Sequence, residues 1–167
     1  MLVSVDIPDA AALRRAFVNS SRSKMASMSL PSPWPLPHAE DLDFLGWVDP
    51  KAPRRAYLVI GPDTVDELTS IELRVPSATA SRKRQTMCDL CQTTEAPDGS
   101  LLMVAPRAGS RGRSGDAVGL YMCTDFACSL RARVPLKPHQ RSLTGMPDTR
   151  VPALVERVTA FVDRVKA

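Results

Sequence analysis

The clearest hydrophobic pattern in the chain lies near its C-terminal end. Apolar side chains recur there at spacings of three and four residues, which place them on one face of an α-helix: Leu154, Val158, Phe161, Val162 and Val165. Pro152 suits the first turn of such a helix, and most of the charged residues lie on other faces. The pattern predicts an amphipathic helix over 152–166 that packs against a sheet.

A weaker helical pattern occupies the N-terminal end. A helix start signal, Pro-Asp-Ala, precedes Leu13 and Phe17, which lie four residues apart on one side. Polar residues after Val18 interrupt the pattern, and Met25 and Met28 then resume it. We expect one helix as far as Val18 and a second short turn through Met28, with both methionines filling the core.

Prolines occupy every second position from 31 to 37. This stretch cannot be helical and favours an extended backbone. We expect a strap that packs Trp34 and Leu36 on the following unit, although such a run also resembles a ligand of proline-reading domains. The strap is the best boundary in the chain, and it divides a short N-terminal helical segment, 1–30, from a second region, 31–167.

The middle of the chain alternates between strand patterns and turns. Residues 42–60 indicate β structure with a turn at 49–53 and a short apolar strand that ends near Ile60. Apolar and charged residues alternate over 71–75, which is typical of a half-exposed strand. A hairpin or meander accounts for both features.

Two further strand candidates follow, at 101–105 and 118–122. The glycine-containing stretch 109–119 between them predicts an exposed, mobile loop. Strong helix formers then predict a helix over 128–133. The expected fold is α+β, with a short N-terminal helical segment, antiparallel β structure and a C-terminal helix.

All four cysteines lie in two close pairs, C-x2-C at 88–91 and C-x4-C at 123–128, with 31 residues between the pairs. Two close pairs set far apart suit one tetrahedral metal ion better than two disulfides, because each pair supplies two thiolates. We therefore predict one structural Zn²⁺, bound by the following ligands: Cys88, Cys91, Cys123 and Cys128.

The elements around the cysteines form a recognisable layout. A knuckle, a hairpin, a strand end and a helix start, with two ligands from each pair, are typical of a treble-clef zinc finger, here spanning 88–133. Thr124 or Asp125 is the expected cap of the helix, and Cys128 lies in its first turn. The helix N-terminus helps to hold thiolate charge.

Two other uses of the cysteines fit the sequence less well. A catalytic zinc usually keeps three protein ligands and an open position for water, whereas four cysteines leave no vacancy, and neither His38 nor His139 lies at ligand spacing. A redox dithiol at 88–91 would leave the second pair unexplained. Because no Ser/His/Asp set, paired acids or phosphate loop can be assembled either, we expect neither an enzyme nor a small-molecule substrate.

Composition places the chain among soluble proteins of about one domain. The N-terminal sequence lacks the basic start and the apolar core of a secretory signal, and no run of about 18 apolar residues is present. We therefore expect no membrane association and a cytoplasmic location, where thiols stay reduced and bind metal.

Positive charge gathers around the cysteines. Residues 74–141 carry eleven basic and five acidic side chains, within a chain of net charge +4. Such an excess suits an acidic protein surface or a ribonucleoprotein, and it is equally typical of a merely solvated face.

Several stretches resemble one family, the elongation factor G-binding proteins. The resemblance rests on LDFLGWVDP at 42–50, RAYLV at 55–59, MCDLC at 87–91 and YMC-x4-CSLR at 121–131, and it covers roughly 31–167. It implies a C-terminal treble-clef zinc finger and a non-enzymatic translation accessory. Family members bind elongation factor G through this domain and promote its release from the ribosome when fusidic acid traps it there.

The resemblance carries over the four zinc ligands and no partner surface, because that surface is not defined by a motif. The candidate contacts near the finger are Phe126, Arg131, Arg133 and Phe161. The rival hypothesis is an RNA- or ribosome-binding zinc module that uses a basic patch on phosphates: Arg82, Lys83, Arg84, Arg111 and Arg113.

Overall fold

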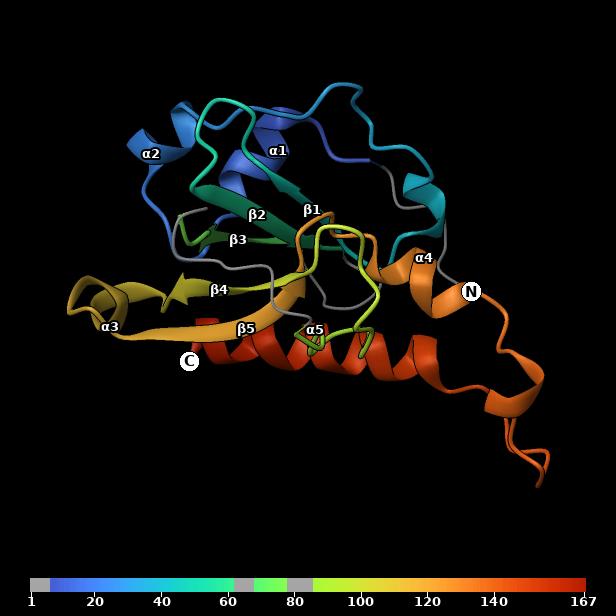
Figure 1. The fold of residues 1–167 in the computed structure, drawn as a ribbon. Coiled ribbons are helices and arrows are strands. Elements are labelled where there is room, and N and C mark those ends of the chain that lie inside the picture. Colours follow the sequence, from blue (N-terminus) through green and yellow to red (C-terminus); the bar gives the residue numbers. More distant parts are fainter. Residues whose placement is uncertain (1–6, 62–67, 78–85) are drawn as a thin grey trace.

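A five-stranded antiparallel sheet forms the centre of the protein (Figure 1). The computed structural model describes residues 7–61, 68–77 and 86–167. The strands follow one another as a meander in the order β1-β2-β3-β4-β5: β1 (Leu45–Val48), β2 (Arg55–Ile60), β3 (Thr69–Arg74), β4 (Ser100–Pro106) and β5 (Ala117–Cys123). The predicted antiparallel β structure is confirmed.

Helices precede, interrupt and follow the strands: α1 (Ala10–Arg15), α2 (Arg22–Ala26), η1 (Ala39–Asp41), α3 (Gly109–Arg113), α4 (Cys128–Arg133), η2 (Pro138–Gln140) and α5 (Arg150–Lys166). The fold is therefore α+β, as predicted. Within the described ranges, no helix is both long enough and apolar enough to cross a membrane.

The long helix α5 covers one face of the sheet (Figure 1). All five apolar residues of the predicted stripe are buried there, packed with Met103 of β4 and Met122 of β5. The C-terminal end of α5 is held by the chain just after β4, because the Ala108 N–H and the Arg107 guanidinium donate to backbone carbonyls of its last turn. The sequence pattern thus predicted this helix and its buried face.

The N-terminal segment packs on the opposite face of the sheet. Asp9 and Ser21 cap α1 and α2, and the helical stretch ends at Arg15 instead of continuing to Val18. Both methionines are buried as expected. Residues on both sides of residue 30 share one apolar cluster. The proposed division of the chain there stays a prediction.

The proline-rich strap lies against this cluster. The Trp34 ring meets the Trp47 ring edge-on at 5.4 Å between centroids, and Leu36 is packed beside it. Trp47 in turn contacts Tyr57, whose ring also meets Phe17 at 5.6 Å. The predicted role of the strap, packing its apolar residues on the next unit, is confirmed.

The prediction that β3 is half-exposed was right at Arg74, which is exposed, and wrong at Glu72, which is buried. Residues Thr69–Leu73 are all buried, because the N-terminal segment covers the face that the alternation assigned to solvent. The Asn19 side chain bonds both the N–H and the carbonyl of Glu72, at 2.8 and 3.0 Å, and the Ser70 N–H donates to the Ala16 carbonyl. Local alternation cannot reveal a cover that comes from a distant part of the chain.

The predicted loop at 109–119 is also corrected. Residues 109–113 form the short helix α3, residues 114–116 form a turn, and residues 117–119 already belong to β5. The Asp116 carboxylate accepts hydrogen bonds from Arg111, and the Asp116 N–H donates to the Arg111 carbonyl, so the turn between α3 and β5 is ordered by its own polar groups. The expected exposure of this stretch is confirmed.

Candidate metal centre

The first cysteine pair lies on a tight turn fixed to β5. Gln92 adopts a left-handed backbone with φ 58°, and its N–H donates to the Cys88 carbonyl at 2.8 Å, which closes the turn and turns Cys91 toward Cys88. Asp89 anchors the turn: its N–H donates to the Tyr121 carbonyl, and its carboxylate accepts the Tyr121 N–H, both at 2.8 Å.

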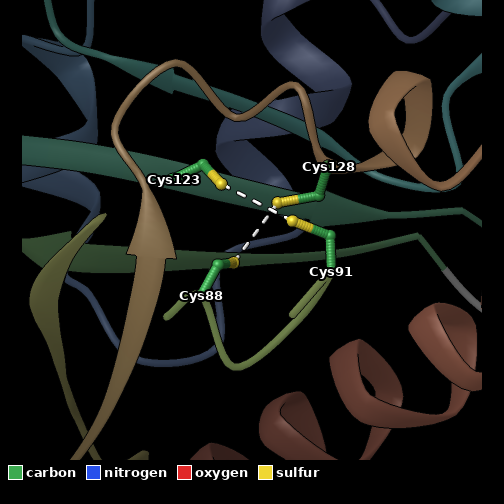
Figure 2. A group of neighbouring side chains, drawn as sticks. All are labelled: Cys88, Cys91, Cys123 and Cys128. Atoms are coloured by element: carbon green, nitrogen blue, oxygen red, sulfur yellow. Dashed lines mark hydrogen bonds between the residues drawn. The ribbon is translucent and has the colours of Figure 1, made fainter. Parts of the chain in front are cut away.

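The second pair is delivered by two different elements. Cys123 is the last residue of β5, and Cys128 is the first residue of α4. Phe126 between them has φ 54°, and its N–H donates to the Cys123 carbonyl at 3.1 Å. This turn folds the chain back so that the strand end and the helix start present their sulfurs to the same point (Figure 2).

The four sulfurs form a compact cluster (Figure 2), all lying within 4.8 Å of one another. Cys88 and Cys128 are 3.7 Å apart, and Cys91 and Cys123 are 3.6 Å apart. With Zn–S bonds of about 2.3 Å, the edge of a ZnS₄ tetrahedron is about 3.8 Å. The separations therefore fit a single zinc ion, and no disulfide joins the cysteines.

The electrostatics of the cluster suit a bound cation. Hydrogen bonding with Cys123, and then with the other sulfurs, holds the pKa of the Cys88 thiol well below its ordinary value. Hydrogen bonding with Cys123 and Cys88, together with burial, holds the pKa of the Cys128 thiol well above its ordinary value. So close a set of sulfurs cannot all ionise unless positive charge neutralises them, which a zinc ion does.

The site is closed. Cys88, Cys123 and Cys128 are fully buried and only Cys91 is partly accessible. Among the described residues, no histidine or carboxylate joins the four sulfurs. A ZnS₄ site of this kind leaves no position for a substrate or a water molecule, so the chemistry that the metal supplies is structural.

Two contacts fix the finger to β1 and to the residues just before it. The Arg133 guanidinium forms a two-pronged ion pair with the fully buried Asp43 carboxylate, at 2.6 and 3.0 Å, and the Asp43 N–H donates to the Ser129 hydroxyl. The Phe126 ring lies against Gly46 of β1, where only a glycine leaves it room. Both contacts join residues 43–46 to the segment that carries the second cysteine pair.

The predicted caps of α4 are corrected. Its N-cap is Ala127, and no side chain caps the helix. Asp125 instead accepts the Ala127 N–H at 3.1 Å and forms an ion pair with Arg131, which lies one turn further along. The hydrogen bond from Arg131 to Asp125, followed by the charges of Asp125 and of the nearby cysteine sulfurs, outweighs burial and raises the pKa of Arg131 above its ordinary value.

Two of the predicted partner contacts are corrected as well. Phe126 is 5% exposed and Phe161 is fully buried, because the first packs on β1 and the second faces the sheet from α5. Neither ring is available to a partner. Arg131 and Arg133 remain partly accessible, but each is engaged by a carboxylate of this chain.

The candidate RNA contacts fall into two groups. Arg82, Lys83 and Arg84 lie outside the described residues. Arg111 is bound by the Asp116 carboxylate at 2.7 Å and donates to the Ala167 carbonyl, so it holds the end of α5. Arg113 is exposed.

Sequence reasoning missed three residues that hold the site. They are Asp43, Gly46 and Arg157, and none of them belongs to a motif. A lone acid and a lone glycine within the apolar run at 42–48 are nevertheless unusual enough to indicate a special contact. Arg157 of α5 donates to the Leu90 carbonyl at 2.9 Å and so fastens the first knuckle to the helix. Its charge placed it outside the apolar stripe, which is why the pattern could not assign it.

Comparison with known proteins supports one assignment. No curated protein and no solved structure shows significant similarity to the chain. A family model, the FBP C-terminal treble-clef zinc-finger, matches residues 12–165, which is nearly the whole length. The match covers the knuckle, the strand end and the helix that together present the four sulfurs, and it confirms the resemblance inferred from the sequence. The chain belongs to the FBP C-terminal treble-clef zinc-finger family.

Proposed function

We propose that this protein is a non-enzymatic, zinc-stabilised translation accessory that binds elongation factor G and promotes its release from the ribosome. The observation that carries the proposal is the closed four-cysteine site within a finger of the FBP family. The assignment of the partner rests on the resemblance to elongation factor G-binding proteins, and the closed site supports a binding role over a catalytic one.

The arrangement of the finger supports this role in physical terms. Zinc joins the knuckle, the end of β5 and the start of α4, and the contacts from Arg133 and Phe126 fix this unit to β1. A surface held on several rigid elements loses little conformational freedom on binding, which favours affinity.

Release of a bound factor requires a difference in affinity. A protein that binds elongation factor G more tightly in its free conformation than in its ribosome-bound conformation shifts the equilibrium toward release by the ratio of the two affinities. We propose that the accessory acts in this way in the cytoplasm. Protection against fusidic acid is then a separate outcome, set by whether release outpaces trapping by the drug.

The test is a calorimetric titration of the zinc-loaded protein with purified elongation factor G from the same organism, with and without RNA. We expect a one-to-one complex with a dissociation constant in the micromolar range or tighter. The absence of binding at micromolar protein refutes the proposal. Binding to RNA alone that weakens steeply as salt rises, with no binding to the factor, favours the rival RNA-binding hypothesis.

Release itself is measured separately, by sedimenting ribosomes that carry elongation factor G trapped by fusidic acid. The proposed accessory lowers the amount of factor in the ribosome pellet. A Cys123→Ser variant serves as the control, because loss of one ligand opens the metal site and removes the rigid surface. Equal sedimentation of the factor with both proteins contradicts the release step while leaving binding intact.

A further inference from the structure

The sheet ends at β5, and the outer edge of this strand is partly open. In the β4–β5 ladder, the residues that bond inward to β4 alternate with residues whose backbone groups point outward. The Arg107 N–H donates to the Asp116 carbonyl and the Thr124 N–H to the Gly99 carbonyl, so the even-numbered residues of β5 face β4. The odd-numbered residues 117, 119 and 121 therefore direct their N–H and C=O groups away from the sheet.

Only one of these outward positions has a partner. The N–H and the carbonyl of Tyr121 are both bonded by Asp89 of the first knuckle. At Ala117 and Gly119, within the part of the chain that the structure describes, no hydrogen bond occupies the outward N–H and C=O groups. The edge thus offers two donors and two acceptors in strand geometry, spaced as in a β-ladder.

The edge lacks the features by which proteins usually discourage strand addition. Exposed edge strands commonly carry charged residues or proline. From Ala117 to Cys123 the strand has neither. Its two open positions are an alanine and a glycine, both exposed, so no side chain shields the backbone groups.

An apolar surface lies next to the open edge. Leu102 and Tyr121 are paired across β4 and β5 on the face that α5 does not cover, and they are 42% and 39% exposed. Leu102 leans across β5 toward the edge: its Cδ1 is 3.0 Å from the place that a Cβ on Gly119 would occupy. A strand added at this edge would therefore bring its side chains onto Leu102 and Tyr121.

We propose that the open edge of β5, at Ala117 and Gly119, binds a short extended apolar segment of a protein partner as a sixth strand. This inference rests on the proposed function, and the segment then belongs to elongation factor G. The partner's backbone would exchange four hydrogen bonds with the two open positions, and its apolar side chains would cover Leu102 and Tyr121. Main-chain pairing supplies affinity in this mode of recognition, and side-chain contacts supply specificity.

A second copy of this chain fits the edge less well. Asp89 occupies the position beside Tyr121, so an added strand must leave the sheet there. A two-fold axis at Val118 would oppose the turn after α3 of one copy to the occupied Tyr121 of the other. An axis at Gly119 would oppose Ala117 to Tyr121, and an axis at Ala117 would oppose Gly119 to the same turn instead of to a strand. A peptide of three or four residues has no such constraint.

The first experiment blocks the edge of β5 and leaves the apolar side chains of Leu102 and Tyr121 in place. In Ala117→Pro, the outward N–H is lost and the proline ring enters the space of the added strand, while the ladder loses no hydrogen bond because this position faces away from β4. Ala117→Ser is the matched control, since it keeps the N–H at the same exposed position. Zinc content and thermal melting confirm that both variants are folded.

Calorimetry with purified elongation factor G should show binding at least tenfold weaker for Ala117→Pro and unchanged for Ala117→Ser. Amide hydrogen exchange should slow at residues 117 and 119 in the complex. Factor binding that Ala117→Pro does not weaken overturns the inference and leaves the proposed function standing. No binding by the wild type overturns both.

Two further measurements complete the test. Leu102→Gln should weaken binding of the factor severalfold, whereas Val134→Gln, which changes an exposed apolar residue elsewhere, should not. Light scattering after size exclusion should give a monomer for the free wild type. A dimer that Ala117→Pro converts to a monomer contradicts the inference, because a second copy then occupies the edge.

Discussion

The contact between Gly46 and Phe126 gives a direct test of how the finger is fixed to the sheet. A Cβ added at Gly46 would lie 2.7 Å from the Cγ of Phe126 and 2.9 Å from its Cε1, and closer still to Cδ1. Carbon atoms in contact normally lie about 3.5 to 4.0 Å apart. Because Phe126 is 5% exposed, its ring has little room to retreat. Gly46→Ala therefore forces the finger and β1 apart.

The magnitudes follow from known responses of packed cores. Overpacking of this kind costs about 1 to 3 kcal/mol, and the depth of the overlap places Gly46→Ala near the upper end. Phe126→Ala removes a buried ring and costs about 3 to 5 kcal/mol. In the double variant the added methyl enters the space that the ring has left, so the second change adds little. The predicted coupling between the two positions is about 2 kcal/mol or more.

The assay is urea unfolding of the wild type, both single variants and the double variant at one fixed concentration of free zinc, because bound metal adds to the apparent stability. Phe126→Leu replaces Phe126→Ala if the latter does not fold. Additive effects, with a coupling below about 0.5 kcal/mol, would show that the ring does not fill the space above Gly46 and would refute the packing argument.

Three other changes test the metal and two buried carboxylates. Metal analysis should find one zinc per chain, and Cys123→Ser or a chelator should unfold the finger, as followed by circular dichroism; a folded, metal-free wild type contradicts this prediction. Burial raises the pKa of Asp49, but hydrogen bonds from the Tyr57 hydroxyl and from backbone N–H groups outweigh it and hold the pKa below its ordinary value. Asp49 thus contributes stability above about pH 4 that is lost as the pH falls through its lowered folded pKa; Asp49→Asn should remove this part of the acid dependence in urea titrations. Arg133→Ala leaves the Asp43 carboxylate buried without its partner and should lower the free energy of unfolding by about 3 to 5 kcal/mol. Equal stability of this variant and the wild type would show that the Asp43 carboxylate is exposed to solvent.

The sequence predicted those features that depend on local spacing. The stripe of α5 and the four metal ligands follow from periodicity and from the distance between cysteines, and both are found where expected. The strap at 31–37 was predicted for the same reason, because alternate prolines exclude a helix whatever surrounds them. Each of these signals is complete within a short stretch of chain.

Features that depend on the meeting of distant segments were not predictable in this way. Phe126 follows a cysteine in a polar turn, and nothing local shows that a glycine 80 residues earlier opens a place for its ring. Arg133 was likewise predicted to contact a partner protein, because nothing local shows that it pairs with Asp43, which lies 90 residues away. The exposure of Glu72 in β3 was misjudged because its cover comes from the N-terminal segment.

These distant contacts bear on whether the finger is a separable module. Arg133 pairs with the Asp43 carboxylate, which has no exposed side-chain surface, and the Ser129 hydroxyl accepts the backbone N–H of the same residue. Excising 88–133 would leave that carboxylate and the surface above Gly46 uncovered, and it would remove β4 and β5 from the sheet. The zinc site is therefore best regarded as part of the core of one continuous fold. Loss of the zinc should therefore destabilise β1 as well as the finger. It should also disrupt any binding surface that the finger presents.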